Sequence, residues 1–197
     1  SVMGVDFIKY IKGEYAFVIY DIEKNQWILV RDRMGTKPIH WTFFNKQFYV
    51  SSEAKALKNI IPLELDKDSL FFSQNFQYLP QGKSLFKNIN LLEPGFMMIV
   101  SNNEVIYKNK FYEMPITTKE KVGFSDAVKN VEKLMISAVE SRIPSEVPFC
   151  AHLSGGIDSS SVCALAAKHG LKDVFTVSFV ESEFHNELPL AKETANM

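Results

Sequence analysis

The sequence has few cysteines, no excess of either charge and no long apolar run. Two cysteines in 197 residues are too few for a disulfide scaffold, which predicts an intracellular, cytoplasmic protein. The 22 Lys and Arg residues balance 23 Asp and Glu residues, so charge gives no reason to expect nucleic acid or an anionic membrane as a partner. No apolar run approaches the roughly 18 residues of a membrane-spanning helix, and the first residues lack the layout of a signal peptide. Apolar residues still make up 46%, which is typical of a folded globular protein.

In the first half of the chain, short apolar runs alternate with polar turn residues, which is the pattern of antiparallel hairpins. The predicted pairs of strands are 15–20 with 26–30, 40–44 with 47–51, and 95–100 with 104–107. Short helices are expected at 52–59 and 67–74, the second with Asp66 as its N-cap. This half is therefore predicted to be antiparallel α+β.

From residue 124 onward, apolar residues follow a helical period, and strands and helices then alternate. The predicted elements are a helix from 125 to about 139, a strand at 149–153, a helix at 159–169, a strand at 174–180 and a helix from 187. Ser125 is the expected N-cap of the first helix, and Gly170 the expected C-cap of the second. The order strand, helix, strand, helix is typical of a parallel α/β sheet. We expect residues 113–123 to be a linker between two domains.

The segment Leu153–Ser160 has the clearest chemical pattern, Leu-Ser-Gly-Gly-Ile-Asp-Ser-Ser, between a predicted strand and a predicted helix. Adjacent glycines allow a tight turn that presents backbone N–H groups, and a helix N-terminus adds about half a positive charge, so the segment favours a phosphate group. Ser154, Ser159 and Ser160 add hydroxyl donors. The Asp158 carboxylate repels phosphate and is better suited to hold Mg²⁺. The alternative is a plain Ser/Gly turn with an Asp placed there by the helix dipole.

This motif resembles the pyrophosphate-binding SGGxDS loop of the PP-loop ATP pyrophosphatases, which cleave ATP between its α and β phosphates. With Ser145–Pro148 before it, and Phe175–Val180 and His185–Glu187 after it, the segment is similar to the start of the synthetase domain of glutamine-dependent asparagine synthetases. The resemblance implies ATP and Mg²⁺ as cofactors, with Asp158 as the metal ligand. It assigns ATP binding to Leu153, Ser154, Gly155, Gly156, Asp158, Ser159, Ser160 and Phe179.

The first half is similar to the class II glutaminase domain of the same family, which has an Ntn-type fold. The matching blocks are Gly13–Asp21, Arg31–Pro38, Ser51–Leu57 and Leu92–Gly95, in the family's order. The implied reaction joins ammonia from glutamine to a β-aspartyl-AMP, giving asparagine, AMP and pyrophosphate. The implied partners are the small molecules ATP, aspartate and glutamine, and the resemblance is compatible with a homodimer of the full-length protein.

The family hydrolyses glutamine with an N-terminal cysteine, whereas this sequence starts with Ser1 and its cysteines are Cys150 and Cys163. We therefore expect an interior piece that holds the second half of a glutaminase domain, 1–112, and the start of a synthetase domain, 124–197. No catalytic residue is assigned, and the chain alone is expected to be inactive. Two alternatives stay open: an amide-forming paralogue of the β-lactam or lasso-peptide synthetase type without glutaminase activity, and a non-catalytic scaffold module.

Four further residues are expected to have structural roles. Cys150, on the predicted buried strand, and Cys163, on the apolar face of a helix, are interpreted as core residues. Arg31 and Asp32 are adjacent in sequence, so in an extended strand their side chains would point in opposite directions and need not pair. We expect both to fix the loop that runs to Pro38.

Overall fold

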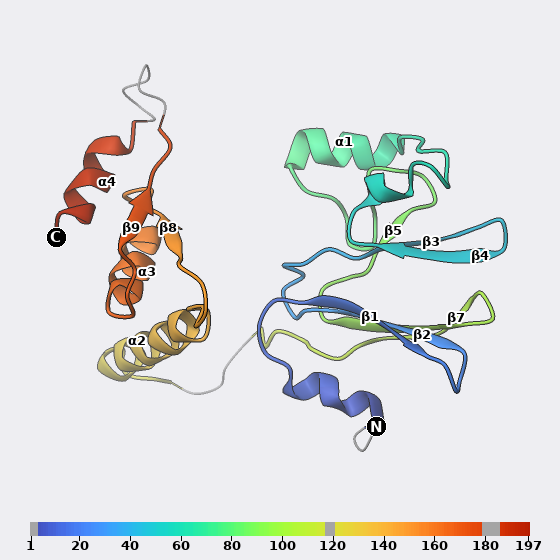
Figure 1. Cartoon of the computed structure of the whole chain (residues 1–197), viewed down its shortest axis with the longest axis horizontal. Coiled ribbons are helices and arrows are strands. Elements are labelled where there is room, and N and C mark those ends of the chain that lie inside the picture. The colour runs from blue at the N-terminus through green and yellow to red at the C-terminus, as the bar shows by residue number, and fades with distance from the viewer. Residues whose placement is uncertain (1–3, 117–120, 179–185) are drawn as a thin grey trace. The chain divides into compact units, whose positions relative to one another are not determined.

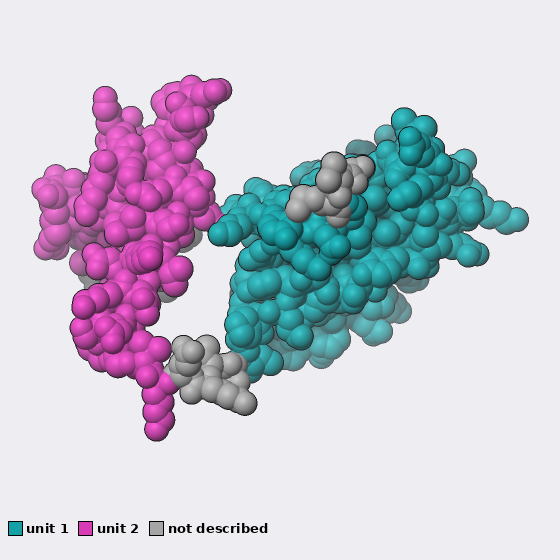
Figure 2. Space-filling model, turned by 90° about the horizontal axis from the view of Figure 1, so that it is seen from below, with its two compact units in different colours: residues 1–117 teal, residues 118–197 magenta. Residues whose placement is uncertain are grey.

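The computed structural model describes residues 4–116, 121–178 and 186–197 of the chain. The chain divides into two compact units, residues 1–117 and residues 118–197 (Figure 2). Among the helices in the described residues, none has both the length and the apolar character needed to cross a membrane.

Unit 1 is built on two antiparallel sheets (Figure 1). The first has the order β1-β2-β6-β7 and consists of β1 (Ala16–Asp21), β2 (Gln26–Arg31), β6 (Phe96–Ser101) and β7 (Glu104–Lys110). The second has the order β4-β3-β5 and consists of β3 (His40–Phe44), β4 (Gln47–Ser51) and β5 (Asn90–Leu91). The three predicted hairpins are therefore confirmed, whereas the two-residue strand β5 is too short to leave a sequence pattern.

Two of the hairpin turns show why these registers form. Asn45 and Lys46 join β3 to β4 with φ of 49° and 60°, and Asn102 and Asn103 join β6 to β7 with φ of 49° and 59°. A two-residue loop with positive φ at both positions has the twist that antiparallel strands need, and Asn tolerates this conformation better than most residues. These turns set Phe44 opposite Gln47 and Ser101 opposite Glu104.

The core of unit 1 lies in layers on both sides of the sheets, because successive residues of a strand point to opposite faces. Leu29 and Met98 pack between the two sheets, where side chains of β3 and β4 contact them. Val30 and Met97 point the other way and pack against Ile8 of the 3₁₀ helix η1 (Gly4–Tyr10). The outer face of the second sheet is covered by the 3₁₀ helix η2 (Ala54–Leu57), which is shorter than the predicted helix at 52–59.

Helix α1 (Lys67–Phe76) begins as predicted, with Asp66 as its N-cap. The Asp66 carboxylate accepts a hydrogen bond of 2.8 Å from the Ser69 N–H. That bond also holds the pKa of Asp66 below its ordinary value, because it favours the charged form.

Arg31 and Asp32 fix the loop after β2, as predicted. The Asp32 side chain is 1% exposed and accepts hydrogen bonds from the backbone N–H groups of Met34, Thr36 and Lys37 at 3.1, 3.0 and 2.9 Å. The Arg31 guanidinium donates to the carbonyl oxygens of Gly35, Lys37 and Leu92 at 2.6, 2.8 and 2.6 Å. Between them, one carboxylate and one guanidinium supply partners for backbone groups that would otherwise be buried without any.

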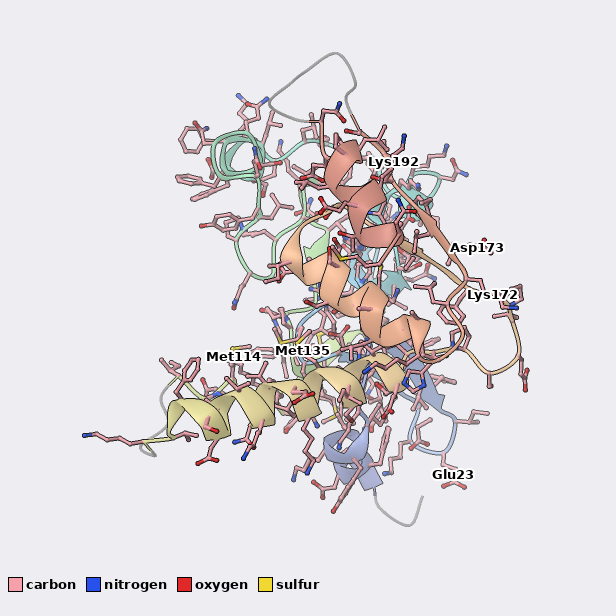
Figure 3. The ribbon with its side chains drawn as sticks, turned by 90° about the vertical axis from the view of Figure 1, so that its left-hand side faces the viewer. Glu23, Met114, Met135, Lys172, Asp173 and Lys192 are labelled. Atoms are coloured by element: carbon pink, nitrogen blue, oxygen red, sulfur yellow. The ribbon has the colours of Figure 1, made fainter. Side chains whose placement is uncertain are left out.

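Unit 2 alternates helices and strands. It contains α2 (Phe124–Glu140), β8 (Cys150–His152), α3 (Ile157–Ala167), β9 (Asp173–Phe175) and α4 (Leu188–Ala195). Strands β8 and β9 pair in parallel, with Ala151 opposite Val174, which confirms the predicted parallel sheet. Helix α3 lies between α2 and α4 (Figures 1 and 3).

Three expectations for unit 2 are wrong. Ser125 is not an N-cap: α2 begins at Phe124, with Gly123 as its N-cap, so Ser125 lies in the first turn. Cys150 is exposed, because Ala151 and Leu153 occupy the face of β8 that packs on the helices and Cys150 points to the opposite face. The strand predicted at 174–180 covers only Asp173–Phe175 among the described residues.

Helix α3 covers Ile157–Ala167 with Lys168 as its C-cap, so it begins and ends two residues earlier than predicted. The expected glycine still terminates it, and the second cysteine is buried as expected. Gly170 has φ of 93°, and the N–H groups of Gly170 and Leu171 donate to the carbonyl oxygens of Ala167 and Ala166 at 3.2 Å each. This is the Schellman arrangement, in which a left-handed glycine ends the helix. Cys163 is buried.

Candidate functional site

The predicted phosphate loop leaves the sheet of unit 2 at a fixed point. The Leu153 N–H donates to the Phe175 carbonyl at 2.9 Å, so the pairing of β8 with β9 continues one residue beyond the strand. The Leu153 side chain is 2% exposed and packs with Cys163 of α3 and Ala191 of α4. The three residues that follow, 154–156, connect this anchored position to the first turn of α3.

The two glycines of the loop have different structural roles. Gly155 has φ of 78°, and a Cβ atom there would lie 2.8 Å from Leu190 Cβ and 2.9 Å from Ala191 N of α4. Gly156 has φ of −73°, and a Cβ atom there would lie 3.4 Å from Ser154 Oγ, which is an ordinary contact. Backbone conformation and packing therefore require glycine at 155 but not at 156. The absence of a side chain at Gly156 leaves the start of α3 open.

Serine hydroxyl groups close the loop on itself. Ser159 Oγ accepts a hydrogen bond from the Ser154 N–H at 3.2 Å and lies 2.8 Å from Ser154 Oγ. The Gly156 carbonyl also lies within reach of the Ser159 hydroxyl, at 3.1 Å. Since a hydroxyl has one proton, Ser159 donates to one of these two acceptors at a time. The Ser159 side chain, which the sequence analysis predicted to bind the ligand, thus holds the loop in shape.

The first turn of α3 presents backbone donors. Its N-cap is Gly156, and in the described part of the chain no side chain caps it, unlike α1, where Asp66 does. The first N–H groups of any helix have no carbonyl partner within the helix, so an anion at this end would satisfy them and interact well with the helix dipole. The structure thus fits a phosphate group by its donor set.

Asp158 lies exposed in the same turn of α3. The described residues contain no group of three or more His, Cys, Asp or Glu side chains arranged to hold a metal ion. Mg²⁺ commonly takes only one or two carboxylates from a protein and its other ligands from water and substrate phosphates. A single carboxylate beside an open helix N-terminus therefore fits Mg²⁺ that arrives with a polyphosphate.

The structure brings seven of the eight predicted ligand-binding residues into one strand end, one loop and one helical turn: Leu153, Ser154, Gly155, Gly156, Asp158, Ser159 and Ser160. Phe179 lies outside the described residues. Sequence reasoning missed the packing of α4 against Gly155. The available signal was Asn186, a residue type that favours helix starts, just before that helix.

Comparisons with known proteins agree with the motifs. Residues 1–112 match the family model described as glutamine amidotransferase domain, and residues 130–197 match the one described as asparagine synthase. Glutamine-hydrolysing asparagine synthetase 1 of Bacillus subtilis is 34% identical over 94% of this chain and 29% of that protein. A putative glutamine-hydrolysing asparagine synthetase 2 of Methanocaldococcus jannaschii is 33% identical over 96% of this chain and 38% of that protein.

Other similar proteins have different names. Amidase chyE of Penicillium rubens is 28% identical over 98% of this chain and 31% of that protein. Among solved structures, the glutamine phosphoribosylpyrophosphate amidotransferase of B. subtilis matches at 14% identity over 88% of this chain and 34% of that one, with a TM-score of 0.35, which does not establish a shared fold.

The chain spans between 29% and 38% of the length of the three relatives named here. The glutamine amidotransferase match covers more than half of the chain, and the asparagine synthase match follows it in order. The chain therefore belongs to the family of glutamine-hydrolysing asparagine synthetases, in which a glutamine amidotransferase domain precedes an asparagine synthase domain.

Proposed function

We propose that this chain is part of a glutamine-dependent asparagine synthetase, an ATP-dependent carbon–nitrogen ligase. The full-length protein would amidate aspartate through β-aspartyl-AMP and release asparagine, AMP, pyrophosphate and glutamate. Residues 1–112 would be the second half of an Ntn-type glutaminase domain, 113–123 a linker, and 124–197 the start of a PP-loop nucleotide-binding domain. The order of the two family matches supports this assignment.

The open N-terminus of α3 is the observation that supports ATP binding. The N–H groups in the first turn of α3 would hold the pyrophosphate part of ATP, together with the hydroxyl groups of Ser154 and Ser160. Mg²⁺ held by Asp158 would offset the negative charge that develops on the leaving pyrophosphate. Leu153 and Phe179 would border the adenine, although Leu153 is mostly engaged in the core.

The test uses the full-length protein and measures aspartate-dependent exchange of pyrophosphate into ATP. Asp158→Asn should lower this exchange at least about 100-fold, because it removes the charge that holds the metal. Asp126→Asn is the matched control, since Asp126 is also an exposed carboxylate in the first turn of a helix of unit 2. Equal exchange rates in Asp158→Asn and Asp126→Asn would contradict the proposed role of Asp158.

The acceptor separates this proposal from its alternatives. The match to a protein named an amidase, over nearly the whole chain, favours testing other acceptors beside aspartate. A paralogue that closes an amide within its own substrate would consume ATP without glutamine. A scaffold module would bind no adenine nucleotide. Product analysis with ATP, glutamine and aspartate, each omitted in turn, distinguishes these outcomes from asparagine synthesis.

A further inference from the structure

Helix α4 lies directly against the phosphate loop. Its Leu190 Cβ and Ala191 N approach Gly155 so closely that even a methyl group on Gly155 would not fit. The Ala191 side chain is 3% exposed and packs with Leu153, just before the loop, and with Cys163 of α3. One short helix therefore touches the loop and both of the elements that the loop connects.

The start of α4 is tied to the chain that follows β9. Asn186 Oδ1 accepts hydrogen bonds from the Leu188 N–H at 3.2 Å and from the Ser178 hydroxyl at 3.0 Å. The Ser178 hydroxyl in turn accepts from the Glu187 N–H at 3.0 Å. A helix as short as Leu188–Ala195 has little stability of its own, so these bonds and its packing must hold it in place.

We infer that α4 supports the phosphate loop by packing against it, and that Asn186 and Ala191 are positioning residues for the nucleotide. The inference rests on the proposed function, because it deepens the role of the same loop. Donors bind a phosphate well only when they are held close to the required geometry. Asn186 fixes α4, and Ala191 transmits that position to the loop by contact.

The first experiment measures steady-state kinetics of the full-length protein with Asn186→Ala and Asn186→Asp. Asn186→Ala should raise the KM for ATP about tenfold, because it removes the acceptor that fixes α4, and should leave the KM for glutamine unchanged. Asn186→Asp keeps the acceptor oxygen and should restore the KM for ATP to within about twofold. An unchanged KM for ATP in Asn186→Ala, or equal rises for ATP and glutamine, would overturn the inference.

The second experiment needs no nucleotide. Hydrogen exchange of residues 154–160 should become about tenfold faster in Asn186→Ala and in Ala191→Val, since the extra methyl groups of valine overfill the packing of residue 191 against Leu153 and Cys163 and push α4 away from Gly155. Ala195→Val makes the same change at an exposed site of α4 and should match the wild type. Lys192→Ala, at the exposed residue next to Ala191 (Figure 3), is a second control.

The two experiments separate the inference from the proposed function. Faster exchange in a protein whose activity does not depend on ATP would support the role of α4 in holding the loop and would refute the nucleotide assignment. Unchanged exchange in both Asn186→Ala and Ala191→Val would refute the inference, whatever the protein does with ATP.

Discussion

Ser154 Oγ and Ser159 Oγ lie 2.8 Å apart, so the residue that opens the phosphate loop is bonded directly to the first turn of α3. The Ser154 N–H adds a second bond to the same hydroxyl at 3.2 Å. The loop is therefore shaped before any ligand arrives, and preorganised donors lose little freedom on binding.

Removing the Ser159 hydroxyl should loosen this closure. Ser159→Ala is expected to lower the free energy of unfolding by about 1 kcal/mol, because the Ser154 N–H loses its partner. It should also weaken ATP binding. Ser159→Thr keeps a hydroxyl and should retain most of both properties. Urea unfolding and calorimetric titration with ATP measure the two effects, and a Ser159→Ala protein as stable as Ser159→Thr would argue against the closure.

Gly155 and Gly170 provide a matched pair, because both have positive φ and only Gly155 is crowded. A Cβ atom at Gly170 would meet nothing within 4 Å, whereas one at Gly155 would meet α4. Gly170→Ala should cost about 1 kcal/mol of stability through backbone strain alone. Gly155→Ala should cost about 3 kcal/mol, since overpacking adds to the strain. Equal midpoints of urea unfolding for Gly155→Ala and Gly170→Ala would show that crowding by α4 adds nothing to the loss of stability.

Gly156 and Gly123 form a second pair, because each is the N-cap of a helix with ordinary negative φ. Replacing either with Ala should cost up to about 1 kcal/mol of stability, the usual loss at an N-cap. Only Gly156→Ala should weaken ATP binding, by at least about tenfold, since its methyl group would occupy space beside the phosphate. Identical ATP affinities for Gly156→Ala and Gly123→Ala would place the phosphate elsewhere.

Asp32 should make unit 1 sensitive to acid. Burial would raise the pKa of Asp32, but hydrogen bonds from the Lys37, Thr36 and Met34 N–H groups outweigh it and hold the pKa below its ordinary value. A carboxyl with a depressed pKa stabilises the fold above its unfolded-state pKa of about 3.9 and loses that contribution as the pH falls through its folded pKa.

The corresponding variant is Asp32→Asn. At pH 7 it should be about 2–4 kcal/mol less stable than the wild type, because an amide cannot accept the buried N–H groups as a carboxylate does. Below pH 4 the stability of the wild type should fall more steeply than that of the variant. Urea unfolding from pH 7 to pH 2 measures both curves, and parallel curves would contradict this role for Asp32.

Local sequence signals predicted much of the fold. Turn residues such as Asn45 and Asn102 placed the hairpins, and Asp66 placed the start of α1, because those signals act within a few residues. The choice of Gly123 over Ser125 as N-cap, and the exposure of Cys150, depend on packing that a linear pattern does not contain. These failures arise where tertiary contacts override local preference.

In the candidate site, too, the local part was predictable from sequence and the tertiary part was not. Leu153–Ser160 is contiguous, so its strand–loop–helix geometry follows from sequence, and the structure confirms that geometry. The support from α4 arises only when Ala191 reaches Gly155 across the fold. No spacing rule links those two residues, so the packing requirement for glycine at 155, unlike the requirement of the tight turn, is visible only in the structure.

The order of strands in unit 1 has a consequence for how it folds. Hairpins β1–β2 and β6–β7 join neighbours in sequence and can form in about 1–10 μs. The pairing of β2 with β6, with Leu29 opposite Met98, joins segments far apart in the chain. It forms more slowly because closing the long loop between them costs conformational entropy. Docking of one hairpin on the other should therefore set the folding rate of unit 1. Core substitutions at Leu29 or Met98 would then slow that docking, whereas changes in the turns would act on an earlier stage.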